Sequence, residues 1–464
     1  MRSEVRLQGS RRERDAEDLE AFDVGKPLRG FRRHHGQNRG RHISIDQPVD
    51  RLGLTFAELG FSRACRRNRS PDTRARCRLP ILYRNVLVSH MYDDGDAFLL
   101  GDSLSGGGDP NARDLPRNNA AKGRRRALIG DPRNDENTIV SQLQGLFLRF
   151  HNRKLKDNPG IASFETLQRL VRFHYQYVVL NDFLPRIVHS SVLSQLKTNG
   201  KYDPQKLKFF HWKTSPFMPV EFSVAAYRFG HSMVRPGYRL NDAVRLPIFP
   251  TADSSEGLTG FREMNPAWGL DWGRFIDIDN RTYDGTDAEN AKRLQFAYRI
   301  DTALVNPLGN LPPSVASNPS SLGARNLLRG WRLGLPSGQL VAQQMGVKPI
   351  DDKDILIGQG VDKPDKPLPN ILSVSGIFKQ NCPLWTYVLA EAMHFKETVK
   401  VPVNKDISIQ TPRLGPVGGR IVAEVFLGLM HGDKHSMLNL APDWLPDTGA
   451  DYKLKDFVRY AIGK

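Results

Sequence analysis

The chain has 464 residues, of which 39% are hydrophobic, and its formal net charge is +17. This length allows one large domain or two smaller ones, with enough apolar residues for a sizeable core. A membrane span is not expected, because no window approaches the roughly 20 apolar residues that a spanning helix needs. The three cysteines, Cys65, Cys77 and Cys382, are too few for a disulfide framework, and nothing in the sequence has the spacing of a zinc site.

Residues 1–90 differ from the rest of the chain. They hold 19 Arg and 1 Lys against 11 Asp and Glu, a net charge of +9, and their helical periodicity is weak. Two interpretations stay open: a disordered basic arm that binds nucleic acid, and an out-of-frame reading of GC-rich coding sequence. No secretory signal is visible, so the default location is cytoplasmic, with secretion as the alternative if this N-terminus is not native. We set the boundaries at 1–90, an arginine-rich atypical segment, and 91–464, the domain proper.

The first strong helical pattern of the domain lies at 139–150, where apolar residues repeat at helical spacing. Arg133 and Glu136 precede it by a few residues, and their spacing of three predicts a shared face at the start of that helix. A solvated Arg–Glu pair is the plain alternative. The next helix is expected to begin at the cap Ser163 and to run to about Leu184, where Pro185 ends it.

A further helix is expected at about 219–234, with apolar residues at 222, 225, 226, 229 and 233. His231 lies on it directly after Gly230, whose missing side chain leaves a bare wall beside the imidazole. A flat cofactor could lie against this wall with a ring nitrogen on its metal. A core histidine bonded to a carbonyl is the plain alternative.

Four prolines predict that 305–321 is loop, and the polar composition of 347–370 predicts an exposed loop. Helices are expected at 336–346, 383–396 and 416–431. Alternation of β-branched residues is rare. We therefore expect a mainly α fold with long irregular loops and few short strands.

Several motifs occur in a fixed order. Gly-Asp-x-Arg-x-x-Glu, followed by Arg-x-His-Asn-Arg, lies within 130–153; Tyr-Arg-x-Gly-His spans 227–231; Asn-x-x-Arg-Gly and Gly-Leu-Pro lie within 326–336. The stretches 383–389 and 414–425 add to the pattern. Together they resemble the animal-type haem peroxidase superfamily, most closely its bacterial branch, over about residues 91–464.

The resemblance implies a bound haem and assigns roles to individual residues. His231 matches the axial ligand of the haem iron, and Asn326 matches the residue whose side-chain carbonyl accepts the other ring N–H. Considered alone, Asn326 reads as a capping or turn residue. Arg133 matches the catalytic arginine on the opposite face of the haem. Glu136 matches the position that forms an ester with a haem methyl in some members, so covalent attachment is open.

The sequence departs from the family pattern on the distal side. The Gln-Phe-x-Asp-His-Asp motif that carries the distal histidine is absent, and so is the calcium loop, which leaves calcium binding unsupported. The histidines of the first ninety residues have the wrong neighbours, and surface histidine is the expected state of each: His34, His35, His42 and His90. Asn137 replaces the methionine that forms a second haem link in one mammalian branch.

The resemblance implies a haem-dependent peroxidase that responds to oxidative stress, reducing hydrogen peroxide and oxidising small organic or halide donors through a high-valent iron–oxo species. Two alternatives stay open. The first is a haem-binding but catalytically impaired scaffold that lacks the distal histidine. The second is a fatty-acid dioxygenase of the same superfamily, which needs a radical tyrosine. Tyr175, Tyr177 and Tyr227 lie on expected helices but match no such motif. Nucleic acid is an expected partner only through residues 1–90.

Overall fold

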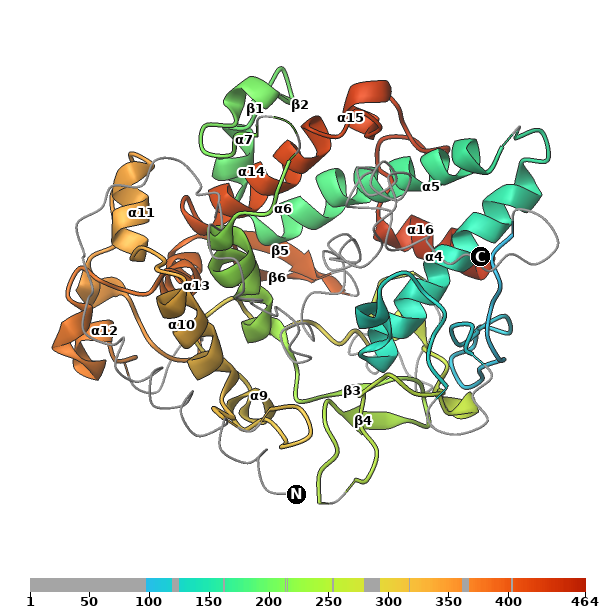
Figure 1. Cartoon of the computed structure of the whole chain (residues 1–464), viewed down its shortest axis with the longest axis horizontal. Coiled ribbons are helices and arrows are strands. Elements are labelled where there is room, and N and C mark those ends of the chain that lie inside the picture. Colours follow the sequence, from blue (N-terminus) through green and yellow to red (C-terminus); the bar gives the residue numbers. More distant parts are fainter. Residues whose placement is uncertain are drawn as a thin grey trace, which may run out of the picture.

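The computed structural model describes residues 97–118, 125–161, 163–212, 214, 216–252, 254–278, 293–316, 318–360, 367–401 and 404–464, with side chains of the last range from 407 onward. The predictions for residues 1–90, including those for Cys65, Cys77 and the four histidines, lie outside these ranges. Within them the protein is mainly α-helical, as the sequence predicts (Figure 1).

The helices fall into three groups by length and type. The longer α-helices are α4 (Thr138–Asp157), α5 (Phe164–Val178), α10 (Leu322–Arg332), α11 (Gly338–Gln344), α13 (Leu384–His394), α14 (Gly418–His431) and α16 (Leu454–Ile462). Short α-helices are α6 (Leu184–Ile187), α7 (Ser190–Ser194), α9 (Asn306–Gly309), α12 (Ile371–Val374) and α15 (Met437–Leu440). Tight or wide helical turns are η3 (Pro132–Asp135), η4 (Val179–Phe183), η5 (Pro204–Lys206), η6 (Glu221–Ala225), η7 (Ala226–Met233), η8 (Pro266–Trp268), η9 (Trp272–Arg274), η10 (Asp352–Asp354) and η11 (Gly376–Phe378).

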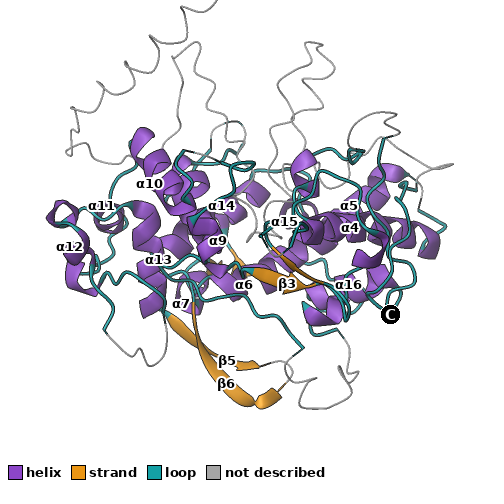
Figure 2. Ribbon diagram, turned by 90° about the horizontal axis from the view of Figure 1, so that it is seen from below, coloured by secondary structure: helices purple, strands orange, loops and turns teal. Residues whose placement is uncertain are grey.

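The strands of the described residues form antiparallel pairs, each a two-stranded sheet. They are β1 (Lys197–Thr198) with β2 (Lys201–Tyr202), β3 (Gly237–Arg239) with β4 (Arg245–Pro247), and β5 (Lys396–Val401) with β6 (Asn404–Pro412). The β5–β6 hairpin extends away from the helices on one side of the molecule (Figure 2). It is longer than the sequence pattern suggests, although the burial of β5 alternates along the strand.

Helices α4, α5 and α16 meet in an aromatic core. The rings of Phe150 and Phe457 stack with centroids 4.1 Å apart and an interplanar angle of 5°. Phe147 contacts the edge of Tyr175 at 5.4 Å, and all four side chains are at most 1% exposed. Burial of such rings is the main stabilising term for helices of this length. The core therefore fixes α4, whose N-terminal end carries the Arg133 segment.

The expected helix boundaries are confirmed at α11, α13 and α14, and two expectations about proline are wrong. The helix after Ser163 does not end at Pro185, because the wide turn η4 interrupts it and α6 continues to Ile187. The segment 305–321 is not wholly loop, since it contains α9. In both short helices the proline occupies the first turn, where a backbone N–H has no helical partner and its loss costs nothing. The expected exposed loop at 347–370 contains the turn η10.

Candidate functional site

The segment that carries His231 is helical, but it is not the α-helix that the periodicity predicts. A wide turn, η6, leads into a tight helix, η7, and the change occurs at Ala225 with φ −124° and ψ −78°. Two side chains bond to backbone carbonyls of this segment. Arg228 Nε, from η7 itself, donates to the Ser223 carbonyl at 3.1 Å, and Trp385 Nε1, from α13, donates to the Arg228 carbonyl at 3.2 Å. Irregular helical turns of this kind arise where side chains enter the hydrogen-bond ladder.

The apolar face predicted for this segment is nevertheless correct. Phe222, Ala225, Ala226 and Phe229 are at most 1% exposed, and Met233 is half-buried. The burial pattern therefore survives the change in helical type, because residues three and four apart still fall on the same side.

The structure brings His231 and Asn326 together across 95 residues of sequence. The imidazole Nδ1 lies 2.9 Å from the side-chain nitrogen of Asn326, and the two residues are 0% and 1% exposed. Asn326 lies inside α10 rather than at a turn or cap. The amide therefore contacts Nδ1 of the imidazole through its nitrogen, whereas the resemblance implies a contact through its oxygen.

Arg228 completes this buried cluster. Its Nη1 donates to the Asn326 side-chain oxygen at 3.1 Å, so the amide lies between the guanidinium and the imidazole. In this arrangement the amide N–H donates to Nδ1, which places the imidazole proton on Nε2. A metal at Nε2 requires the other tautomer, in which Nδ1–H donates to the amide oxygen. A half-turn of the amide about its last side-chain bond produces it.

Arg133 and Glu136 do not share the start of α4. Arg133 lies in η3 and Glu136 is the C-cap residue of η3, whereas α4 begins at Thr138. Arg133 instead pairs with Asp131 in a fork, Nε at 2.8 Å from both carboxylate oxygens and Nη2 at 2.6 Å from Oδ2. The tight turn of η3, with Pro132 in its first turn, draws the arginine back toward Asp131.

A buried ion cluster fixes the same segment. Arg117 binds Asp135 through Nη1 and Nη2 at 2.8 and 2.9 Å, and it binds Asp114 through Nε and Nη2 at 2.7 and 2.9 Å. Burial raises the pKa of Asp135, and the bonds from Arg117 oppose that change. Gly260 packs directly against the backbone of Asp135, since a Cβ at position 260 would lie 1.8 Å from the Asp135 carbonyl oxygen.

Sequence reasoning missed Arg228, Trp385 and Arg117. The first two lie inside motifs that point to the family, so their positions carried a signal, but their contacts depend on the tertiary arrangement. Arg117 lies in a stretch with no periodic pattern, and nothing in the sequence indicates its two carboxylate partners.

Two other buried side chains of types that can bind metals, those of His151 and Cys382, pack in the protein interior. His151 is fully buried and its ring lies 4.4 Å from that of Phe98. Cys382 is a buried free thiol, and burial raises its pKa. Among the described residues no cluster of three or more His, Cys, Asp or Glu side chains could hold a metal ion. In the same part of the chain, no helix combines the length and apolar character that crossing a bilayer requires.

Comparison with known families identifies the class to which this fold and site belong. The model of the animal haem peroxidase family matches residues 103–359, more than half of the chain, so the chain belongs to that family. The match includes the Arg133 segment, His231 and Asn326.

Curated relatives agree with this assignment. Dual oxidase of Drosophila melanogaster is 27% identical over 230 residues, which is 48% of this chain and 14% of that protein. Human thyroid peroxidase is 29% identical over 218 residues, which is 45% of this chain and 21% of that protein. The chain thus spans less than a quarter of the length of these relatives.

Two solved structures are also similar to the chain. Peroxidase A of Dictyostelium discoideum aligns with a TM-score of 0.45 and 18% identity, covering 76% of this chain and 61% of that one. The Oryza sativa fatty acid alpha-dioxygenase aligns with a TM-score of 0.41 and 13% identity, covering 82% and 58%.

Proposed function

We propose that the protein is a haem-dependent peroxidase in which His231 binds the iron and Asn326 hydrogen-bonds to Nδ1 of His231. Arg133 would stabilise the negative charge that develops on the peroxide. The observation that carries the proposal is the contact of 2.9 Å between the buried imidazole and the buried amide. A haem held by a neutral imidazole supplies the redox chemistry that cleaves the peroxide O–O bond. Glu136, buried beside the Arg133 segment, is the candidate for covalent attachment.

The residues on the imidazole side suit a haem. His231 is fully buried, and a neutral amide is a weaker hydrogen-bond acceptor than a carboxylate, so the ring would stay neutral rather than anionic. For the ring to present a lone pair at Nε2, the Asn326 oxygen must accept Nδ1–H. The Arg228 guanidinium then loses that oxygen as an acceptor and keeps the Ser223 carbonyl. Haem uptake would therefore change the hydrogen bonds of Arg228.

Arg133 would supply a permanent positive charge on the peroxide side. An arginine stays protonated at any working pH and stabilises negative charge on the departing oxygen. The Asp131 carboxylate holds this guanidinium through the fork described above, so Asp131 orients Arg133 and also offsets part of its charge. Hydrogen peroxide and a small organic or halide donor are the proposed substrates.

The second candidate is a haem-binding scaffold with little turnover. Two observations favour it: the chain has no Gln-Phe-x-Asp-His-Asp motif, and the Arg133 guanidinium faces the Asp131 carboxylate. The fatty-acid dioxygenase alternative needs a radical tyrosine, and the surroundings of Tyr175 and Tyr177 do not favour that role. Tyr175 packs in the aromatic core and the Tyr177 hydroxyl donates to the Ala450 carbonyl at 2.7 Å.

Peroxide turnover by the haem-reconstituted full chain tests the proposal. The rate of guaiacol and iodide oxidation is compared with that of free haemin at equal concentration. We expect the protein to exceed free haemin by about 100-fold or more, and Arg133→Gln to lower the rate by about 10²- to 10³-fold. Arg245→Gln, an exposed arginine of β4, is the matched control. Full haem uptake with turnover at the rate of free haemin would establish the scaffold instead.

A further inference from the structure

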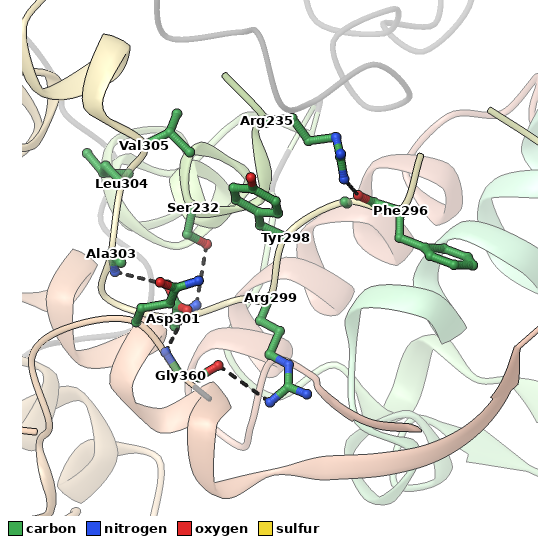
Figure 3. A pocket seen from close by; sticks show the side chains of 12 residues that line it. Ser232, Arg235, Phe296, Tyr298, Arg299, Asp301, Ala303, Leu304, Val305 and Gly360 are labelled. Atoms are coloured by element: carbon green, nitrogen blue, oxygen red, sulfur yellow. Dashed lines mark hydrogen bonds between the residues drawn. The ribbon is translucent and has the colours of Figure 1, made fainter. Parts of the chain in front are cut away.

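A cavity of about 550 Å³ lies beside the C-terminal end of η7, where the chain leaves the His231 segment (Figure 3). Ser232 and Arg235 form one wall, and the extended segment 296–305 forms another, with Gly360 at the edge. The volume falls within the range of about 300–1,000 Å³ that is typical of small-molecule sites. None of the residues that we assign to iron or peroxide lines it.

The cavity wall carries a cation, Arg235, that has no carboxylate partner in the described part of the chain. Arg235 Nη1 donates to the Phe296 carbonyl at 2.9 Å, and the guanidinium lies 5.5 Å from the Tyr298 ring centre. Among the described residues no aspartate or glutamate pairs with Arg235, and its buried Nε has no hydrogen-bond partner there. An arginine in this state can bind the two oxygens of an incoming carboxylate.

The acidic side chain of the cavity, Asp301, is already engaged. Its Oδ1 accepts the Ala303 N–H at 2.9 Å, and its Oδ2 accepts the Gly360 N–H at 2.8 Å. Burial raises the pKa of Asp301 to about 6, so the carboxyl carries only part of a charge in mildly acidic solution. A second arginine, Arg299, also lines the cavity. The wall is therefore net positive.

The remaining wall is apolar and partly aromatic. Phe296 and Tyr298 are 44% and 37% exposed, which is unusual for rings of this size, and Figure 3 shows Tyr298 between the Arg235 and Asp301 parts of the cavity. Leu304 and Val305 add aliphatic surface. Rings that face a cavity beside a guanidinium favour a flat, apolar ligand body.

We propose that this cavity binds a small aromatic carboxylate. The carboxylate binds the Arg235 guanidinium, and the ring packs on Tyr298 and Phe296. The proposal goes beyond the peroxidase function and does not depend on it, because the site is complete without haem. Since Ser232 directly follows His231, a bound acid lies next to the segment that holds the imidazole.

Isothermal titration of the full chain with 2-naphthoate tests the proposal without any measurement of activity. We expect saturable binding to the wild type and binding at least about tenfold weaker in Arg235→Gln, since a charge-assisted fork to a carboxylate contributes about 1.4 kcal/mol or more. The control Arg245→Gln removes the same charge from β4 and should bind like the wild type. The neutral analogue 2-naphthamide should bind the wild type at least about tenfold more weakly than the acid.

Tyr298→Leu provides a second variant that keeps Arg235, and it should also weaken binding of 2-naphthoate. Each variant is compared with the wild type by thermal unfolding, so that only folded proteins are titrated. Equal affinity of wild type and Arg235→Gln would overturn the proposal. So would equal affinity for acid and amide, or a loss of binding in Arg133→Gln, which would place the ligand elsewhere.

Discussion

Replacement of Asn326 by leucine should destabilise the protein even without haem. Leucine has the same branched arrangement of side-chain heavy atoms as asparagine but offers neither a donor nor an acceptor. The change leaves His231 Nδ1 and Arg228 Nη1 without the amide, at 2.9 and 3.1 Å in the wild type. A buried polar group that loses its partner costs about 1–3 kcal/mol, and more for a charged group. The imidazole and the guanidinium each lose one buried hydrogen bond, while Arg228 keeps its bond to the Ser223 carbonyl, so the expected loss is about 2–4 kcal/mol.

Urea unfolding of the apo protein, followed by circular dichroism, measures this loss. Asn310→Leu is the matched control, because Asn310 is exposed and its side-chain amide donates to Asn306 in the short helix α9, which Asn310 directly follows. It should change stability by less than about 0.5 kcal/mol. Asn326→Asp should stabilise relative to Asn326→Leu, since a carboxylate accepts from both neighbours. If Asn326→Leu unfolds within about 0.5 kcal/mol of the wild type, the buried cluster does not have the structure described here.

Three further predictions concern the surroundings of the site. Arg117→Met strands two buried carboxylates and should cost about 3–5 kcal/mol in urea unfolding; a cost below 1 kcal/mol would contradict the cluster. Gly260→Ala places a Cβ against the Asp135 carbonyl oxygen and should lower the thermal midpoint, whereas Gly309→Ala, with open space around it, should not. Asp301 is protonated more readily in the folded protein, so its contribution to stability is present near pH 4 and falls by about 3 kcal/mol as the pH rises through about 6. The difference in urea midpoint between wild type and Asp301→Asn should shrink or reverse across that range, and a constant difference would refute the assignment.

The sequence predicts burial here better than it predicts backbone geometry. The apolar spacing around His231 identifies the buried face, because any helical turn with three to four residues places those side chains together. It cannot predict the wide and tight turns η6 and η7, which depend on Arg228 and on Trp385 from α13. The same limit explains the error at Pro185, where a distant environment decides whether a helix continues past a proline.

The site itself was predicted only in part. His231 and Asn326 belong to ordered motifs, and the structure places their side chains in contact, while their roles toward a haem stay a prediction. The partner of Arg133 was not foreseen, because a shared face with Glu136 assumed regular α-helix from residue 133 onward. The contacts of Arg117 with its two carboxylate partners could not be predicted, since they join segments without any periodic pattern. The cavity at Arg235 was equally hidden, because its walls come from three separate stretches of chain.

The central claim is that the His231 imidazole binds haem iron, and a haem titration of the full chain tests it most directly. The folded wild type should take up haem with saturation and show the absorption spectrum of histidine-ligated iron. His231→Ala should lose that spectrum and recover it when free imidazole is added. Uptake by His231→Ala with an unchanged spectrum, or no uptake by folded wild type, would contradict the claim.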